Sequence, residues 1–143
     1  MRSPNPKLNY IRRLYAPQDA LLESIEAELE RLNFSWQMGA EECRLLQMLM
    51  RLHGTRKVVE VGTLAGYCAI WMARALPADG HVWTFERNPE HAALAQQFIA
   101  CSDAAEKITV ITGDAHGELE QIVPLGPFDM MVIDAEKPGY NAY

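Results

Sequence analysis

The segment from residue 57 to residue 67 carries the pattern most directly connected with chemistry. It reads K-V-V-E-V-G-T-L-A-G-Y, a short apolar run that ends in an acidic residue and two spaced glycines. Gly62 can let the backbone approach a ligand that a Cβ atom would block, and Gly66 lies where a helix is expected to begin. A loop that binds the pyrophosphate of a dinucleotide has the motif G-x-G-x-x-G. The three glycine positions of this motif are occupied here by Gly62, Leu64 and Tyr67. Only the first glycine is present, so the spacing favours a cofactor that carries adenosine but no pyrophosphate.

Three further positions supply groups that such a cofactor needs. Glu86 lies 20 residues after Gly66, a spacing suited to a carboxylate that holds both ribose hydroxyls. Asp114 can accept a hydrogen bond from the adenine amino group, or it can cap the helix that follows it. Thr63 and the amides after it lie near an expected helix start, where N–H groups can bind an anion. In S-adenosylmethionine that anion is the methionine carboxylate, so this cofactor and methyl transfer are the favoured interpretation.

Asp134 and Lys137 are the candidates for the reaction itself. Asp134 closes the most apolar expected strand, where an unpaired carboxylate would be costly without a cation or hydrogen bonds. A hard divalent ion such as Mg²⁺ is one such partner, and the methionine ammonium group is another. Lys137 can point into the same site and act as a base if desolvation and a nearby metal lower its pKa. On spacing alone, a solvated surface lysine is the favoured interpretation of Lys137.

Alternating strands and helices must position these groups. We predict strands at 58–61, 81–86, 108–111 and 128–133, and helices at 65–76, from Pro89 after an Asn88 cap, and at 118–123. Such an alternation indicates an α/β fold with a Rossmann-like, doubly wound parallel sheet. Ligands bind such sheets beyond the carboxyl ends of the strands, where the strand order reverses. Each predicted strand ends in or near a carboxylate, so four carboxylates are expected along one edge.

The residues before the first strand are expected to be helical after an irregular arm at 1–16. A first helix is predicted to begin near Pro17, with an apolar stripe that packs on the core or on a partner subunit. The stripe consists of Leu22, Ile25, Leu29 and Leu32. A second helix is predicted at 40–53, ending at Gly54. We therefore expect a single domain over 1–143, with a helical N-terminal cap at 1–54 and a Rossmann-like half at 55–143.

Composition narrows the class of partner and the compartment. The chain has 143 residues and a net charge of −6, which argues against a nucleic-acid partner. The cysteines, Cys43, Cys68 and Cys101, are far apart and form no C-x-x-C pair, which fits a reducing cytoplasm. The sequence has neither the apolar run of a signal peptide nor a window that approaches a membrane span. We expect a cytoplasmic protein without membrane or nucleic-acid partners.

These motifs together resemble a known family. E-V-G-T-L-A-G-Y at 60–67, the strand ending in Glu86, G-D-A at 113–115 and D-A-E-K-P-G-Y-N-A-Y at 134–143 resemble the cation-dependent class I O-methyltransferases. This family contains catechol and caffeoyl-CoA O-methyltransferases, and the bacterial branch is the most similar. The resemblance begins at A-P-Q-D-A-L-L, residues 16–22, and continues to the last residue.

The resemblance implies a function, a cofactor and a role for each matching residue. The expected cofactor-binding residues are Met38, Glu60, Gly62, Thr63, Gly66, Tyr67, Cys68, Glu86, Arg87, Asp114, Ala115 and Asp134. Asp134 is implied to be a metal ligand, with Mg²⁺ as the expected ion, and Lys137 to assist deprotonation of the acceptor. The implied reaction is an in-line transfer of the methyl group to a hydroxyl of a small catechol-like or phenolic acceptor, in a homodimer.

Two departures from the family keep alternatives open. The family usually has serine where this chain has Cys68; a thiol is a poorer donor, and a buried, inert thiol is the other interpretation. The family also continues past the equivalent of Tyr143, with an Asp-Asn pair that completes the metal site. One carboxylate is too few for a tight Mg²⁺ site, and strand four is left as a bare apolar edge. A truncated, non-catalytic remnant that binds the cofactor weakly, or that only assembles with a partner, is the alternative.

A nicotinamide-dependent oxidoreductase is a third hypothesis. The glycine spacing argues against it, because the turn that holds a pyrophosphate is missing. The sequence also lacks a Y-x-x-x-K pair, since Lys137 precedes Tyr140. Tyr140 and Tyr143 are candidates for a wall of the acceptor pocket or for simple packing.

Overall fold

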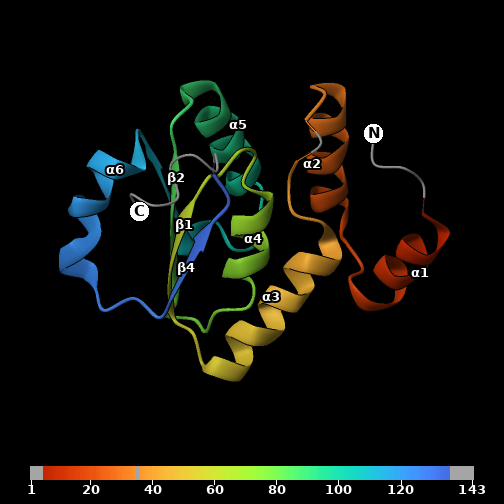
Figure 1. The fold of residues 1–143 in the computed structure, drawn as a ribbon, viewed down its shortest axis with the longest axis horizontal. Coiled ribbons are helices and arrows are strands. Elements are labelled where there is room, and N and C mark those ends of the chain that lie inside the picture. Colours follow the sequence, from red (N-terminus) through yellow and green to blue (C-terminus); the bar gives the residue numbers. More distant parts are fainter. Residues whose placement is uncertain (1–4, 35, 136–143) are drawn as a thin grey trace.

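A computed structural model describes residues 5–34 and 36–135 as helices packed on both faces of a parallel sheet. Figure 1 shows the sheet at the centre, with α6 on one side and α4 and α5 on the other. The helices are α1 (Pro6–Tyr15), α2 (Ala20–Arg31), α3 (Ala40–His53), α4 (Tyr67–Ala73), α5 (Pro89–Ala100) and α6 (Ala115–Glu118), with 3-10 helices η1 (Ala105–Lys107) and η2 (Leu119–Leu125). The strands are β1 (Lys57–Val61), β2 (His81–Glu86), β3 (Ile108–Thr112) and β4 (Met130–Ile133).

The sheet has the predicted doubly wound arrangement. All its strand pairs are parallel, in the order β3-β2-β1-β4. The order reverses at β1, so the ligand-binding crevice of such a fold lies above the carboxyl ends of β1 and its neighbours. The register puts Glu60 of β1 opposite Thr84 of β2 and Val132 of β4. Within the described residues β4 is an edge strand, as expected, and its Met131 is 42% exposed.

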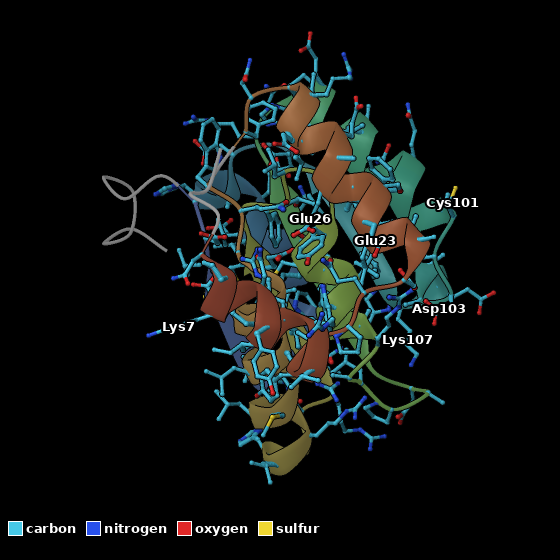
Figure 2. All side chains as sticks on the ribbon, turned by 90° about the vertical axis from the view of Figure 1, so that its right-hand side faces the viewer. Lys7, Glu23, Glu26, Cys101, Asp103 and Lys107 are labelled. Atoms are coloured by element: carbon cyan, nitrogen blue, oxygen red, sulfur yellow. The ribbon has the colours of Figure 1, made fainter. Side chains whose placement is uncertain are left out.

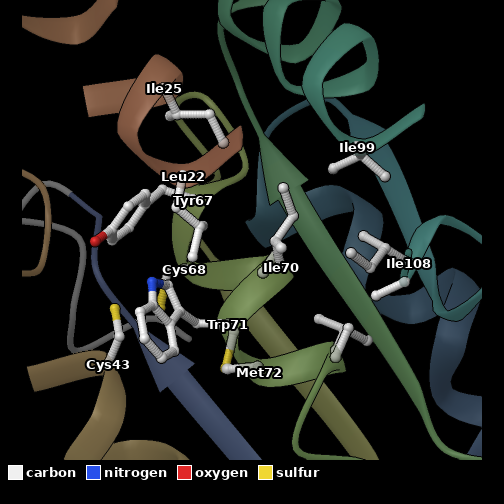
Figure 3. Close-up of a cluster of buried hydrophobic side chains, with 14 of the residues drawn as sticks. Leu22, Ile25, Cys43, Tyr67, Cys68, Ile70, Trp71, Met72, Ile99 and Ile108 are labelled. Carbon is white, nitrogen blue, oxygen red and sulfur yellow. The ribbon is translucent and has the colours of Figure 1, made fainter. Parts of the chain in front are cut away.

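Two apolar cores cover the two faces of the sheet. Val58 and Val82 face a large cluster that includes Ile70 of α4 and Ile99 of α5, part of which Figure 3 shows. Val59, Val61 and Phe85 face a smaller cluster with Ala115 of α6 and Ile122 of η2. Alternate residues of one strand therefore point to opposite cores, which explains the continuous apolar runs in the sequence.

The N-terminal arm is a helix, and our prediction of an irregular segment at 1–16 is wrong for its described part. Asn5 is the N-cap of α1, because its side chain accepts hydrogen bonds from the amides of Lys7 and Leu8. Pro6 occupies the first helical position, where a missing N–H costs nothing. The helix buries none of its residues and lies across α3 at the surface (Figure 2), where Arg12 pairs with Glu41 at 2.5 Å.

Other elements differ from the prediction at their ends. The helix expected from Pro17 begins at Ala20, since Asp19 caps it through a 3.0 Å hydrogen bond from the amide of Leu22. The helix expected at 65–76 spans Tyr67–Ala73, and it starts later because Gly66 has a left-handed conformation and acts as its N-cap. The helix expected at 118–123 is instead the short α6 followed by η2. The predicted β4 starts two residues later than expected, at Met130.

The apolar stripe of α2 packs on the core, the first of the two alternatives for it. Leu22, Ile25 and Leu29 are buried in the larger cluster, whereas Leu32 follows the helix and is 37% exposed. None of the described helices is long and apolar enough to cross a membrane.

Candidate functional site

A cavity of about 760 Å³ lies at the carboxyl ends of the strands, within the range of small-molecule sites. Most of the predicted cofactor residues line it, namely Met38, Gly62, Thr63, Tyr67, Cys68, Glu86, Arg87, Asp114, Ala115 and Asp134. The strand ends that we expected to form one edge thus meet around one cavity. Glu60 and Gly66, also predicted, are not among the lining residues.

Gly62 is required by the backbone beside it. It has φ of +101°, and a Cβ at this position would lie 2.3 Å from the carbonyl oxygen of Asp134. The Asp134 amide also donates to the Val61 carbonyl at 2.8 Å, so the ends of β1 and β4 are in close backbone contact. We expected Gly62 to make room for a ligand; the nearest atoms a Cβ would meet belong to the chain itself.

Glu86 is held in place by two backbone amides. Its Oε2 accepts a hydrogen bond from the Leu64 amide at 2.8 Å, and Oε1 accepts one from the Asn88 amide at 2.9 Å. Each carboxylate oxygen has two acceptor sites, so one remains on each oxygen for a ligand. The Leu64 bond also occupies one of the amides that we expected to bind an anion. The Gly66 amide also donates its hydrogen bond within the chain, to the Thr63 carbonyl. Fewer amides of this loop are therefore available to bind an anion than we predicted.

Glu60 is fully buried beneath the cavity. Its Oε2 accepts a hydrogen bond from Thr84 Oγ1 at 2.6 Å, and Oε1 has no hydrogen-bond partner among the described residues. Burial, reinforced by the charges of Asp134 and Glu86, raises the pKa of Glu60 to about 7, although the Thr84 hydrogen bond opposes this rise. The site therefore contains a carboxyl that is half ionised near neutral pH, with one unsatisfied oxygen.

Cys68 is a neutral thiol in the wall of the cavity. It is 9% exposed and lies beside the Glu60 carboxyl, but it donates its hydrogen to Met38 Sδ at 3.5 Å. Contact with the Cys43 thiol and burial raise the pKa of Cys68 well above its ordinary value. Among the described residues, Cys43, Cys68 and Cys101 are all free. Its burial and raised pKa agree with the interpretation of Cys68 as an inert side chain. Its hydrogen bond to Met38 connects two of the predicted cofactor residues directly.

Tyr67 and Gly66 serve the packing of α4 as well as the loop. The ring of Tyr67 is buried, and its hydroxyl donates to Gln18 Oε1 at 2.5 Å, toward α2. Gly66 has φ of +79°, and a Cβ there would come within 3.0 Å of the Ile99 side chain. The glycine is needed for this conformation and for the approach of α5.

Asp114 adopts the helix-capping role that we considered beside adenine binding. Its Oδ1 accepts hydrogen bonds from the amide of His116 at 3.1 Å at the start of α6. The side chain is 61% exposed, and the residue lines the cavity. Capping and ligand binding use different acceptor sites of one carboxylate, so the two roles are compatible.

Asp134 is exposed at the cavity wall, which removes the strong burial we had assumed for it. Partial desolvation, followed by the charge of Glu42, still raises its pKa. Within 5–34 and 36–135, no three His, Cys, Asp or Glu side chains are grouped so as to hold a metal ion. These residues alone do not fit a metal site. Lys137, Tyr140 and Tyr143 lie outside the described residues.

Sequence reasoning missed an aromatic group at the mouth of the cavity. Trp36 lines the cavity, although 64% of its surface is exposed, and its ring meets Phe34 edge-on at 5.0 Å. His91 of α5 packs against the other side of Phe34 at 5.0 Å, and its Nδ1 is 3.8 Å from Glu86 Oε1. These residues come from two distant segments, and no motif connects them.

Comparison with known proteins gives a consistent result. A family model described as O-methyltransferase matches residues 16–143. A catechol O-methyltransferase of Niastella koreensis is 41% identical over 127 residues, covering 87% of this chain and 58% of that protein. A catechol O-methyltransferase of Mycobacterium tuberculosis is 37% identical, covering 87% of this chain and 54% of that protein. The chain thus spans a little over half the length of these curated relatives.

Solved structures of similar fold include cofactor complexes. The O-methyltransferase TomG of Streptomyces achromogenes, in complex with SAM, superposes with a TM-score of 0.89 at 32% identity, covering 95% of this chain and 62% of that one. An O-methyltransferase of Bacillus cereus, in complex with SAH, gives 0.87 at 33% identity, covering 94% of this chain and 63% of that one.

Proposed function

Because the chain belongs to the O-methyltransferase family, we propose that its cavity binds S-adenosylmethionine for methyl transfer to a hydroxyl of a small catechol-like or phenolic acceptor. Relatives of 37–41% identity are named catechol O-methyltransferases, and two similar structures contain SAM or SAH. The chain spans only 54–58% of these relatives. That it has the activity of a whole enzyme is therefore part of what we propose.

One observation carries the proposal, namely two carboxylates that keep acceptor sites for a ligand. Glu86 lines the cavity, is fixed by backbone amides and retains acceptor sites for a ribose diol. Glu60 does not line the cavity itself, but its buried Oε1 has no hydrogen-bond partner among the described residues, and a methionine ammonium group would satisfy it. The residues present therefore fit S-adenosylmethionine.

The chain contributes binding and orientation to the reaction. When bound, S-adenosylmethionine supplies an electrophilic methyl group on a sulfonium sulfur, which keeps the electron pair of the broken bond. Met38 and Cys68 line the cavity in contact with each other, and Asp114 offers an acceptor for the adenine amino group. The exposed ring of Trp36 offers a flat apolar face at the mouth, suited to an aromatic acceptor. Lys137 remains the predicted base for the acceptor proton.

Metal assistance remains a prediction from the family resemblance. Asp134 offers a single carboxylate, and the described part of the chain supplies no group of three ligands around it. Mg²⁺ requires about six oxygens, so Asp134 alone does not fit it. A salt bridge from Asp134 to the methionine ammonium group is the other role that we considered for this carboxylate.

Isothermal titration of S-adenosylhomocysteine into the purified chain at pH 8 tests the cofactor proposal. We expect measurable binding that Glu86→Ala weakens at least about tenfold, because two ribose hydrogen bonds to a charged group are lost. Glu106→Ala, the same change of charge at an exposed position outside the cavity, is the control. The absence of binding by the unaltered chain would refute the proposal.

The same preparation separates an enzyme from a non-catalytic remnant. Incubation with S-adenosylmethionine and a catechol, with and without Mg²⁺, followed by mass spectrometry of the acceptor, reports methyl transfer directly. Transfer only with Mg²⁺ supports metal assistance, whereas cofactor binding without transfer in either condition supports the remnant.

The acidic net charge of −6 and the three free cysteines support a cytoplasmic protein that does not bind nucleic acid.

A homodimer is the assembly that we propose. Helix α3 carries exposed apolar residues on one stripe, and α1 adds more beside it. The stripe consists of Leu45, Met48, Leu49 and Leu52. Tyr15 at the end of α1 contacts Met48 Sδ at 2.7 Å, so the two helices form one continuous surface. Exposed apolar surfaces of this kind often mark protein interfaces.

A further inference from the structure

A chain of buried hydrogen bonds connects Glu60 with the glycine loop. Thr84 stands directly opposite Glu60 in the ladder between β1 and β2, and both residues are fully buried. Thr84 Oγ1 lies 2.6 Å from Glu60 Oε2 and 2.5 Å from Oγ1 of Thr63, which belongs to the loop and lines the cavity. Thr84 lies inside β2, two residues before Glu86 at the end of the strand.

The chain of hydrogen bonds has a direction when Glu60 is ionised. A carboxylate only accepts hydrogen bonds, and a threonine hydroxyl has a single hydrogen to donate. Thr84 must therefore donate to Glu60 and accept from Thr63. This arrangement binds Oε2 firmly and leaves Oε1 as the unsatisfied oxygen of the carboxylate.

We propose that Thr84 is a positioning residue for the cofactor: it turns the Glu60 carboxylate so that Oε1 meets the ammonium group of S-adenosylmethionine. Through Thr63, it also ties this carboxylate to the glycine loop, which lines the cavity. The inference rests on the proposed function, because it assigns the ammonium group as the partner of Oε1. Valine has nearly the shape of threonine but no hydroxyl, so Thr84→Val removes the positioning without opening a large cavity.

The charges around Glu60 make this role measurable. The groups that influence the carboxyl are Cys68 on α4, Glu86 at the end of β2 and Asp134 after β4. None of them is a cation, and burial raises the pKa of Glu60 to about 7, while the Thr84 hydrogen bond and, after it, the neighbouring Cys68 thiol lower it. An ammonium ligand binds the ionised carboxylate, so affinity rises with pH by about tenfold between pH 6 and 8. Without Thr84, the pKa rises further and the midpoint of this profile moves to higher pH.

Titration calorimetry of S-adenosylhomocysteine from pH 6 to 9 tests the inference on the whole chain. We expect Thr84→Val to weaken binding at pH 7 about tenfold and to raise the midpoint of the pH profile by about one pH unit. Thr84→Ser should restore both, since it keeps the donor. Thr63→Val is the matched control, because it removes the 2.5 Å contact but leaves the bond to Glu60; its midpoint should not move.

The outcomes distinguish this inference from the proposed function. If the unaltered chain binds the ligand and Thr84→Val has the same affinity and the same pH profile, the positioning role is refuted and the function stands. If the unaltered chain does not bind, the proposed function fails as well. If Thr84→Val does not fold, Thr84→Ala takes its place: a midpoint raised by about one pH unit supports the inference, and the midpoint of the unaltered chain contradicts it.

Discussion

Glu60 connects the stability of the unliganded protein to pH. An unfolded glutamate has a pKa near 4.5, whereas the buried carboxyl titrates near 7, so the folded state binds more protons between these values. Stability is therefore lost as pH rises through this window, by about 3 kcal/mol in total. Glu60→Gln keeps an acceptor for Thr84 but cannot ionise. We expect the free energy of unfolding of the variant, measured in urea relative to that of the unaltered chain, to be higher by about this amount at pH 8 than at pH 5.

A null result at this residue has a clear meaning. If the two proteins lose the same stability between pH 5 and pH 8, the Glu60 carboxyl is not the group that responds to pH. The comparison is made between two proteins at each pH, so the other titrating groups of the chain cancel to first order.

At the scale of elements, Asp19 joins the start of α2 to α4 and to the segment after α5. Its Oδ1 caps α2, and its Oδ2 pairs with Arg74 at 2.5 Å, which also pairs with Asp103 at 2.7 Å. Asp19→Ala removes the cap and an ion pair, whereas Asp103→Ala removes only an exposed ion pair. We expect urea unfolding to show that Asp19→Ala costs about 1 kcal/mol more than Asp103→Ala.

Serine at the same position isolates the cap from the charge. Asp19→Ser keeps a side-chain oxygen for the Leu22 amide but loses the pair with Arg74. Its free energy of unfolding should match that of Asp103→Ala rather than that of Asp19→Ala. Equal losses of stability in Asp19→Ala and Asp19→Ser would contradict the capping argument.

The elements also show where prediction from sequence succeeds. The strands were found because apolar β-branched runs alternate with helical patterns, and the α2 stripe was found from its spacing. The α1 helix was missed because Asn5 and Pro6 can start a helix or interrupt one, and local sequence does not decide between them. The start of α4 depends on Gly66, which packs closely against Ile99, and no local pattern contains this contact.

At the scale of the whole molecule, we expect a homodimer formed through the exposed stripe of α3. Leu49 and Leu52 are 50% and 82% exposed, so charges there should not disturb the core. The double variant Leu49→Glu and Leu52→Glu should be monomeric by light scattering after size exclusion, because two copies would bury like charges. Val123→Glu changes a residue of η2 that is 68% exposed, and its mass should remain that of the unaltered chain.

The contacts across the molecule explain which site residues could be predicted. Residues at strand ends were predictable because all parallel strands deliver their carboxyl ends to one edge. The pairing of Glu60 with Thr84 depends on the register of β1 and β2, which the sequence does not state. The group of Trp36 and His91 depends on where Phe34, in the segment after α2, meets α5, so no spacing in the sequence indicates it.

The close backbone contact between Gly62 and Asp134 has a consequence for how this protein can vary. The glycine loop and the wall that carries Asp134 are joined by main-chain atoms, with no side chain between them that could be exchanged for a longer or shorter one. The spacing between this loop and Asp134 is therefore a property of the fold. Under the proposed function, substitutions in the surrounding side chains would alter which molecules bind and how tightly, while this spacing would be inherited unchanged.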